Sequence, residues 1–325
     1  MAKAITYLEA ISEGLREEMR RDKSVFLLGE DIGPYGGAFK VTKGFLEEFG
    51  EDRVIDTVLG EAAIIGAATG AAIVGMRPVA EMQFADFVTN GFNQLVNITA
   101  KYHYRNFIPV PMVLRLPSGG GIHGGPFHST NPEGWFFHVP GLKLVAPSTP
   151  SDAKGLIKAA IRDPNPVLYF EHKYLYRHIK AEVPEDDYIV PIGKADVKRE
   201  GNDATVITYG SGVHWSLEAA EKISAEGVGV EILDLRTLQP LDRGAIFQSV
   251  KKTGKALIVH EDTLTGGVGA EVAALISEHC FSYLDAPVKR VASLDTPVPY
   301  APTLEQWFLP NTEKVLNALR SLSSY

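Results

Sequence analysis

The chain has 325 residues, of which 45% are hydrophobic and 22% charged, and its formal net charge is −8. Such a composition is ordinary for a globular protein of one or two domains, and the absence of a Lys/Arg cluster argues against nucleic-acid binding. The only cysteine, Cys280, excludes an intrachain disulfide. The acidic N-terminal segment is unlike a signal peptide and no apolar run is long enough to span a membrane, so we expect a cytoplasmic protein.

The first half of the chain predicts alternating helices and strands. The first helix is expected to begin at Thr6, because Thr6 and Glu9 have the spacing of a capping box and apolar residues follow at helical spacing. Residues 61–75 are mostly small or apolar and predict a helix packed on most sides, whose Gly66 and Ala67 permit a neighbour to approach closely. The other elements expected here are strands at 24–29, 78–84 and 111–117 and a helix at 91–105.

Alternation continues beyond a glycine-rich loop. Residues 141–171 predict a strand, a helix and a strand, with Thr149 as N-cap and Pro150 in the first helical turn. Residues 180–203 are charged, contain proline and lack long periodicity, which indicates an inter-domain linker. Strands and helices then alternate again to the end of the chain. This pattern predicts an α/β fold with parallel sheets in two domains, the second the smaller.

The loop "LPSGGGIHGGPFHST", residues 116–130, is open to three interpretations: a phosphate-binding loop, a metal site or a slack turn. A phosphate loop of the Walker type ends in Gly-Lys-Ser/Thr, whereas Gly125 is followed by Pro126 and Phe127. A metal site on His123 and His128 lacks a cysteine or nearby carboxylate to complete its ligands. Composition therefore gives little support to the first two.

Two further features each have a structural and a functional interpretation. The turn "YGSG", residues 209–212, resembles a nucleophile elbow or a dinucleotide loop, but Tyr209, Val213 and Trp215 stand where those patterns need glycine. We therefore interpret it as a structural strand-to-helix turn. Glu61 is the first residue of the 61–75 helix. In the structural interpretation it is a carboxylate that the helix N-terminus favours at this position. In the functional interpretation it is a half-buried carboxylate that hydrogen-bonds a ligand nitrogen.

Four long blocks resemble one known family. They are "GEDIGPYGGAFKVTKGF", "DTVLGEAAIIGAATGAAIVGMRPVAEMQFADF", "LRLPSGGGIHGGPFHST" and "VPGLKLVAPSTPSDAKGLIKAAIRDPNPVLYFEHKYLYR". They are similar to the beta subunit of the thiamine-diphosphate-dependent 2-oxo acid dehydrogenases, the first components of the pyruvate, branched-chain and acetoin complexes. The resemblance implies a pyrimidine-binding domain with a parallel sheet at residues 1–183, a linker at 184–203 and a transketolase C-terminal-like α/β domain at 204–325.

The resemblance also implies roles for single residues. Glu61 matches the glutamate that hydrogen-bonds ring nitrogen N1′ of the cofactor, where it shares a proton as a general acid–base. Leu59, Gln83 and Phe87 match residues that line the pyrimidine pocket. His128 matches a histidine beside the active-site channel that assists acyl transfer to the lipoyl group, and imidazole titrates near neutral pH. Thr130 departs from the family pattern, which has glutamine at that position.

Metal ions and partners follow from the same resemblance. Some members hold a monovalent cation such as K⁺ on backbone carbonyls and an acid, which suit a hard cation. The matching positions are Met112, Ala160, Ile161, Asp163 and Asn165. The sequence contains no Gly-Asp-Gly element of the kind that binds Mg²⁺ and the diphosphate. The resemblance thus implies half a site, completed by an alpha subunit in an α2β2 heterotetramer that serves a lipoyl-bearing dihydrolipoyl acyltransferase.

The activity implied is oxidative decarboxylation of a 2-oxo acid with reductive acylation of the lipoyl group, in which this chain acts only with the alpha subunit. Two other hypotheses stay open: a non-catalytic assembly paralogue and an NAD-binding dehydrogenase. The presence of both Glu61 and His128 favours the enzyme over the paralogue, and the incomplete glycine pattern disfavours the dehydrogenase. The sequence leaves open whether the substrate is pyruvate, a branched-chain acid or acetoin.

Overall fold

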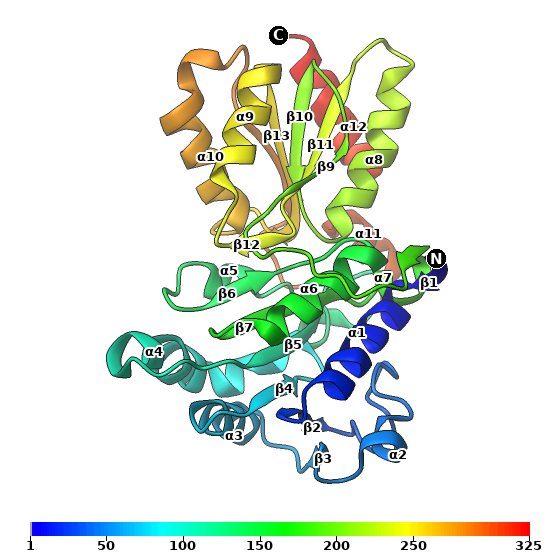
Figure 1. Cartoon of the computed structure of the whole chain (residues 1–325). Coiled ribbons are helices and arrows are strands. Elements are labelled where there is room, and N and C mark those ends of the chain that lie inside the picture. Colours follow the sequence, from blue (N-terminus) through cyan, green and yellow to red (C-terminus); the bar gives the residue numbers. More distant parts are fainter. Residues whose placement is uncertain (1) are drawn as a thin grey trace.

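The computed structural model describes residues 2–325, and two main sheets organise them (Figure 1). The first sheet has seven strands in the order β12-β6-β7-β5-β4-β2-β3, all parallel except β12. Its strands are β2 (Val25–Glu30), β3 (Val54–Thr57), β4 (Arg77–Glu81), β5 (Val113–Ser118), β6 (Lys143–Val145), β7 (Val167–His172) and β12 (Thr237–Gln239).

The second sheet has five strands in the order β14-β13-β10-β11-β9, with β9 antiparallel to the rest. They are β9 (Asp196–Arg199), β10 (Ala204–Thr208), β11 (Val230–Asp234), β13 (Ala256–Thr263) and β14 (Lys289–Ser293). A small antiparallel pair joins β1 (Ala2–Thr6) to β8 (Lys180–Pro184). The expected α/β class is therefore confirmed, with each mostly parallel sheet carrying one antiparallel edge strand.

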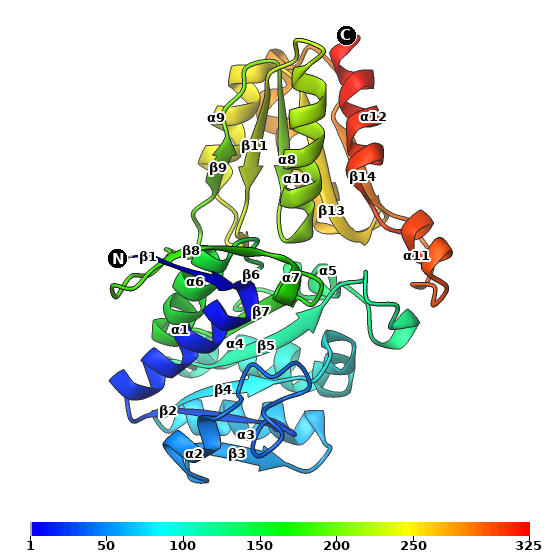
Figure 2. The ribbon, with the colours of Figure 1, turned by 90° about the vertical axis from the view of Figure 1, so that its right-hand side faces the viewer.

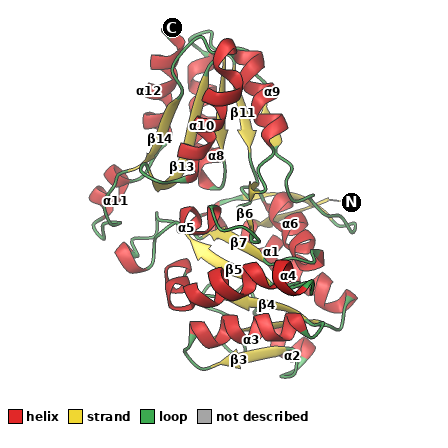
Figure 3. Ribbon diagram, turned by 90° about the vertical axis from the view of Figure 1, so that its left-hand side faces the viewer, coloured by secondary structure: helices red, strands yellow, loops and turns green. Residues whose placement is uncertain are grey.

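Helices cover both faces of each sheet (Figures 2 and 3). Around the first sheet lie α1 (Tyr7–Arg21), α2 (Phe45–Phe49), α3 (Glu61–Ile73), η1 (Ala85–Gly91), η2 (Gln94–Thr99), α4 (Ala100–Asn106), η3 (Gly125–Phe127), α5 (Glu133–Phe137), α6 (Pro150–Arg162) and α7 (Leu175–His178). Around the second lie α8 (Ser211–Ser224), α9 (Arg243–Thr253), α10 (Val268–Cys280), η4 (Phe281–Tyr283), α11 (Pro302–Phe308) and α12 (Thr312–Ser323). None of the helices in residues 2–325 is long and apolar enough to cross a membrane.

Strand β2 shows how the sequence fills two cores at once. Its successive side chains point to opposite faces of the sheet, so a fully apolar strand is buried on both sides. Phe26 and Leu28 pack with the helix α3 core, whereas Val25 and Leu27 pack with α1 and α6 on the other face. This double burial fixes the ends of the parallel strands, where the site residues lie.

Most sequence-based expectations for single elements hold, with two corrections. Thr6 forms the capping box with Glu9, and Thr149 caps α6 with Pro150 in its first turn. Helix α3, however, packs on one face only: Gly66 and Ala67 are exposed, and within residues 2–325 no atom outside the helix's own backbone and the adjacent residues lies within 4 Å of a β-carbon built on Gly66. The helix expected at 91–105 is instead an irregular succession of η1, η2 and α4, because 3₁₀ and π turns interrupt the α-helical ladder.

The two sheets share one continuous core. Apolar residues of α3, β5 and α5 belong to the same buried cluster as residues of β10, α9 and α10. Strand β12 follows β11 in the chain but pairs with β6 of the first sheet, which joins the two halves. The segment interpreted as a linker contains β9, the edge strand of the second sheet. The domain boundaries at residues 183 and 204 stay a prediction.

Arg115 is the largest fully buried side chain and lies in the first sheet between two glutamates. Its Nε and Nη2 atoms donate to Glu171 at 2.6 and 2.8 Å, and Nη1 pairs with Glu81. The hydroxyl of Tyr176 donates to Glu171 at 2.6 Å. Because β4, β5 and β7 are adjacent, this network ties the three central strands together.

Glu133, a buried carboxyl at the domain junction, predicts a pH-dependent stability. The hydroxyl of Tyr209 donates to Glu133 at 2.8 Å. Burial, reinforced by the nearby charge of Asp262, raises the pKa of Glu133 above its ordinary value of 4.5. From about pH 4.5 up to that raised value, the folded chain keeps a proton that the unfolded chain has lost, so the free energy of unfolding falls as pH rises.

We therefore expect Glu133→Gln to remove most of this fall, since an amide keeps the acceptor for Tyr209 without ionising. Thermal unfolding at about pH 5 should show little difference from wild type, whereas near pH 8.5 the variant should be more stable by roughly 2 kcal/mol. Parallel pH profiles for the two proteins would contradict this account of Glu133.

Candidate active site

Glu61 is the first residue of α3, directly after the loop that leaves β3. It is only 7% exposed, and its carboxylate accepts one hydrogen bond, 3.1 Å from the Asn90 side-chain nitrogen. Leu59, two residues earlier, is 81% exposed. The carboxyl ends of parallel strands are the usual ligand edge of an α/β sheet, and this is where Glu61 lies. An aromatic nitrogen base with an apolar ring would fit such a carboxylate beside an apolar surface.

Glu30 is a second carboxylate at this edge, which the sequence analysis missed. It ends β2, is buried, and accepts a hydrogen bond from the Gly60 backbone nitrogen at 3.1 Å, while its other oxygen has no partner among residues 2–325. Burial raises the pKa of Glu30, and the charge of Glu61 adds to the increase while the Gly60 contact opposes it. An acid at the end of an otherwise apolar strand was the signal that could have identified it.

Of the predicted pocket residues in and before η1, Phe87 contacts His128, whereas Gln83 contacts Asp31. Gln83 donates to Asp31 at 2.7 Å. The ring of Phe87 meets His128 edge-on with centroids 5.5 Å apart, and Phe84, which we did not predict, does so at 4.6 Å. Since η1 also carries Asn90, one short helix contacts both Glu61 and His128.

Hydrogen bonds join the two ends of the glycine loop to each other and to η1. The Gly119 nitrogen donates to the Thr130 carbonyl at 3.3 Å, and the Thr130 nitrogen donates to Asp86 at 3.1 Å. The Thr130 hydroxyl lies 3.5 Å from the Pro126 carbonyl, too far for a strong hydrogen bond. Thr130 thus holds the loop through its backbone, a contact that any residue at this position can make.

Glycine is required in this loop by both space and backbone angle. Gly119 has φ +89°, and a β-carbon there would lie 2.3 Å from the His172 ring. Gly125 has φ +67°, and a β-carbon would lie 2.2 Å from the ring of Tyr300. L-residues rarely adopt such angles, so the loop is a tightly packed structure and the slack-turn interpretation fails. No group of three or more His, Cys, Asp or Glu within residues 2–325 is arranged to hold a metal ion.

The residues matched to a monovalent-cation site do lie together at the C-terminal end of α6. They are Met112, Ala160, Ile161, Asp163 and Asn165. Asp163 is 2.5 Å from the Lys143 ammonium, and the Ile161 carbonyl accepts from Arg77 at 2.7 Å. Two fixed positive charges thus already engage oxygens of Asp163 and Ile161, which disfavours an additional cation there, and the cation site stays a prediction.

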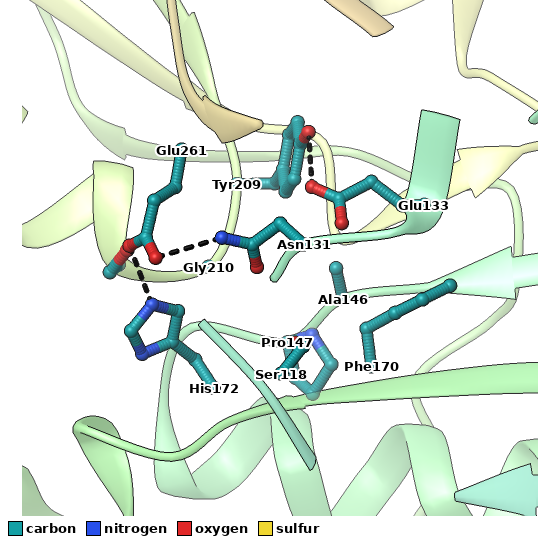
Figure 4. A pocket seen from close by; sticks show the side chains of 11 residues that line it. Ser118, Asn131, Glu133, Ala146, Pro147, Phe170, His172, Tyr209, Gly210 and Glu261 are labelled. Carbon is teal, nitrogen blue, oxygen red and sulfur yellow. Dashed lines mark hydrogen bonds and ion pairs between the residues drawn. The ribbon is translucent and has the colours of Figure 1, made fainter. Parts of the chain in front are cut away.

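The "YGSG" turn behaves as a structural element. Gly210 has φ +55° between β10 and α8, and the Ser211 hydroxyl donates to Glu261 at 2.9 Å. His172 contacts the same carboxylate at 2.7 Å, as does Asn131 at 2.8 Å (Figure 4). Burial would raise the pKa of Glu261, but His172 and the other donors lower it to about 2. Ser211 donates a hydrogen bond to a carboxylate that stays ionised and is therefore a poor general base. This is not the arrangement of an activated nucleophile.

Comparison with known proteins agrees with this fold. The model of the transketolase pyrimidine-binding domain matches residues 3–179, and that of the transketolase C-terminal domain matches 193–315. A solved structure described as a split-gene transketolase, an inactive beta4 tetramer, superposes with a TM-score of 0.79 at 23% identity, covering 98% of both chains. At that identity the likeness shows the fold alone.

Three relatives are similar over nearly the whole chain. The 2-oxoisovalerate dehydrogenase subunit beta of Bacillus subtilis is 56% identical, covering 99% of both chains. The pyruvate dehydrogenase E1 component subunit beta of Staphylococcus epidermidis is 45% identical, covering 98% of both. The mitochondrial 2-oxoisovalerate dehydrogenase subunit beta 2 of Arabidopsis thaliana is 44% identical, covering 99% of this chain and 90% of the relative. The chain therefore belongs to the family of beta subunits of the thiamine-diphosphate-dependent 2-oxo acid dehydrogenases.

Proposed function

We propose that this chain supplies the pyrimidine-binding half of a thiamine-diphosphate site for oxidative decarboxylation of a 2-oxo acid. The observation that carries the proposal is Glu61: a buried carboxylate at a helix N-terminus, at the ligand edge of the sheet, with one protein hydrogen bond. When bound, thiamine diphosphate serves as the electron sink for decarboxylation.

The chain's own residues would bind and orient the cofactor's pyrimidine. Glu61 would hold a proton at ring nitrogen N1′, and Phe87 would pack on the ring. Leu59 and Val58, 81% and 86% exposed, would be covered by the cofactor and a partner chain. Because the residues from 2 to 325 offer no cluster for Mg²⁺, we assign the diphosphate and its metal to the alpha subunit of an α2β2 tetramer.

His128 would serve the second half-reaction. Its imidazole lies edge-on against Phe84 and Phe87, on the η1 side of the site that also reaches Glu61. We propose that it positions or protonates the lipoyl group of the dihydrolipoyl acyltransferase, since an imidazole can both donate and accept a proton. We also propose residues 1–183 and 204–325 as the two domains, joined by a linker at 184–203; the two main sheets support this division, apart from β12, which pairs with β6 of the first sheet.

A substrate panel tests the proposal. The chain is co-expressed with its alpha subunit, and the purified complex is assayed with thiamine diphosphate, Mg²⁺ and 2-oxoisovalerate, pyruvate or acetoin. We expect the highest kcat/KM with the branched-chain acid, because the 56% identity to a 2-oxoisovalerate dehydrogenase subunit exceeds that to the pyruvate relatives. A correctly assembled, cofactor-loaded complex that turns over none of the three would favour the assembly role instead.

A further inference from the structure

The glycine loop that carries His128 is held from two sides. Its ends are fixed within the first domain by Asp86 and by the Gly119–Thr130 backbone pair. Its middle is held by the second domain, because α11 extends toward the loop that follows β5 (Figure 2). The ends alone would leave residues between Gly120 and His128 free to move.

Two buried carboxylates of the second domain make the contacts. Glu261 accepts from the Gly120 nitrogen at 2.6 Å. Glu305, in α11 and only 1% exposed, accepts from the Gly121 nitrogen at 3.0 Å through one oxygen. Its other oxygen lies 2.6 Å from Nδ1 of His123. Charge-assisted hydrogen bonds of this kind are short and directional, so they fix position as well as supply energy.

His123 has a backbone conformation that residues other than glycine adopt uncommonly. Its φ of +60° lies in the left-handed region, where a residue with a β-carbon is strained. Its side chain is 48% exposed, so burial does not force this conformation on it. Such strain persists only where surrounding contacts impose it, and the contact present here is Glu305.

The loop segment that joins His123, the partner of Glu305, to His128 is short and tightly packed. Only four residues separate His123 from His128, and one of them, Gly125, lies against Tyr300 of the second domain. His128 in turn is packed between the edges of Phe84 and Phe87. A loop released at His123 would lose the restraint that keeps His128 in that position.

We propose that Glu305 and His123 form a latch through which the second domain positions His128. They are positioning residues, neither of which touches the reacting groups. The effect on acyl transfer rests on the proposed function of His128, whereas the effect on loop order does not.

The test uses the α2β2 complex with Glu305→Ala, His123→Gly and the double variant. Gly adopts φ > 0 without strain, so His123→Gly removes the imidazole while favouring the native backbone. Gln306→Ala, an exposed neighbour in α11, is the matched control. Loop order is read from chymotrypsin cleavage after Phe127, which is 66% exposed. Two rates are then compared: decarboxylation with an artificial electron acceptor, and acylation of a lipoyl domain.

Each single latch variant should raise the cleavage rate and lower lipoyl acylation by roughly tenfold, the size of losing one charge-assisted hydrogen bond. Decarboxylation should stay near the wild-type rate. Because Glu305→Ala removes the contacts to both His123 and Gly121, the double variant should be no worse than Glu305→Ala alone. Glu305→Gln, which keeps an acceptor for Gly121, should recover part of the loss. If the Glu305→Ala complex does not assemble, Glu305→Gln is used in its place to test the latch.

Additive effects in the double variant, or wild-type cleavage in both single variants, would overturn the latch. A general structural defect is distinguished because it would lower decarboxylation and acylation together. If the wild-type complex itself does not acylate lipoyl, the role of His128 fails, while the cleavage experiment still decides whether the latch exists.

Discussion

Replacing Glu61 by Gln should lower the decarboxylation kcat of the assembled enzyme by about 10²- to 10⁴-fold, the range of a lost general acid–base. The amide retains the size of the side chain and can still accept from Asn90, but it cannot share a proton with the cofactor nitrogen. Steady-state assays with saturating thiamine diphosphate measure the effect.

The competing explanation is that Glu61 only stabilises the N-terminus of α3. Glu313 is a matched control, since it is an acid in the first turn of α12 and is exposed. Loss of such a carboxylate costs roughly 0.3–1 kcal/mol of stability by weakening the helix-dipole interaction. Glu313→Gln should therefore keep full activity. If Glu61→Gln also kept the wild-type kcat, its catalytic assignment would be wrong.

Replacing Arg115 by Met should destabilise the fold by about 3–5 kcal/mol, the cost of leaving buried carboxylates without their cation. Glu171 is fully buried and Glu81 only 5% exposed, so neither can turn to water. Burial raises the pKa of Glu81 and Arg115 opposes that rise; without the arginine this carboxyl would have to take up a proton. A lower unfolding midpoint in urea, or failure of the complex to assemble, reports the loss.

Two comparisons isolate the cause. Arg320→Met breaks an exposed pair with Glu226 and should cost less than about 1 kcal/mol. Combining Arg115→Met with Glu81→Gln and Glu171→Gln removes all three charges and should recover much of the stability. An Arg115→Met variant as stable as Arg320→Met would show that this buried network contributes little.

Local chemistry made part of the fold predictable. The caps at Thr6 and Thr149 are formed by atoms within three residues of one another, so their spacing alone identifies them. Strand β2 can be recognised in the sequence by its continuous run of apolar residues. Strand β12 carries no such signal, because its partner β6 lies far away in the sequence and on the other side of the junction.

The candidate site likewise contains residues that the sequence pointed to and residues that it did not. Glu61 and His128 could be proposed as site residues because they stand in blocks that resemble a known family. Glu30 could have been noticed as an acid at the end of an apolar strand, but its contact with Gly60, 30 positions further along the chain, could not be predicted. Glu305 carries no such signal, because its contact with His123 spans 182 positions of the sequence. The exposed face of α3 was missed for another reason: small residues permit close packing, but only a partner can supply it.

The central claim is that this chain holds half of a shared cofactor site, and cofactor binding by the separated subunits tests it most directly. Thiamine diphosphate with Mg²⁺ is titrated into this chain, into the alpha subunit and into their complex, and 2-oxo acid decarboxylation is measured in the same samples. We predict saturable tight binding and turnover only in the complex. Tight binding together with decarboxylation by this chain alone would contradict the account.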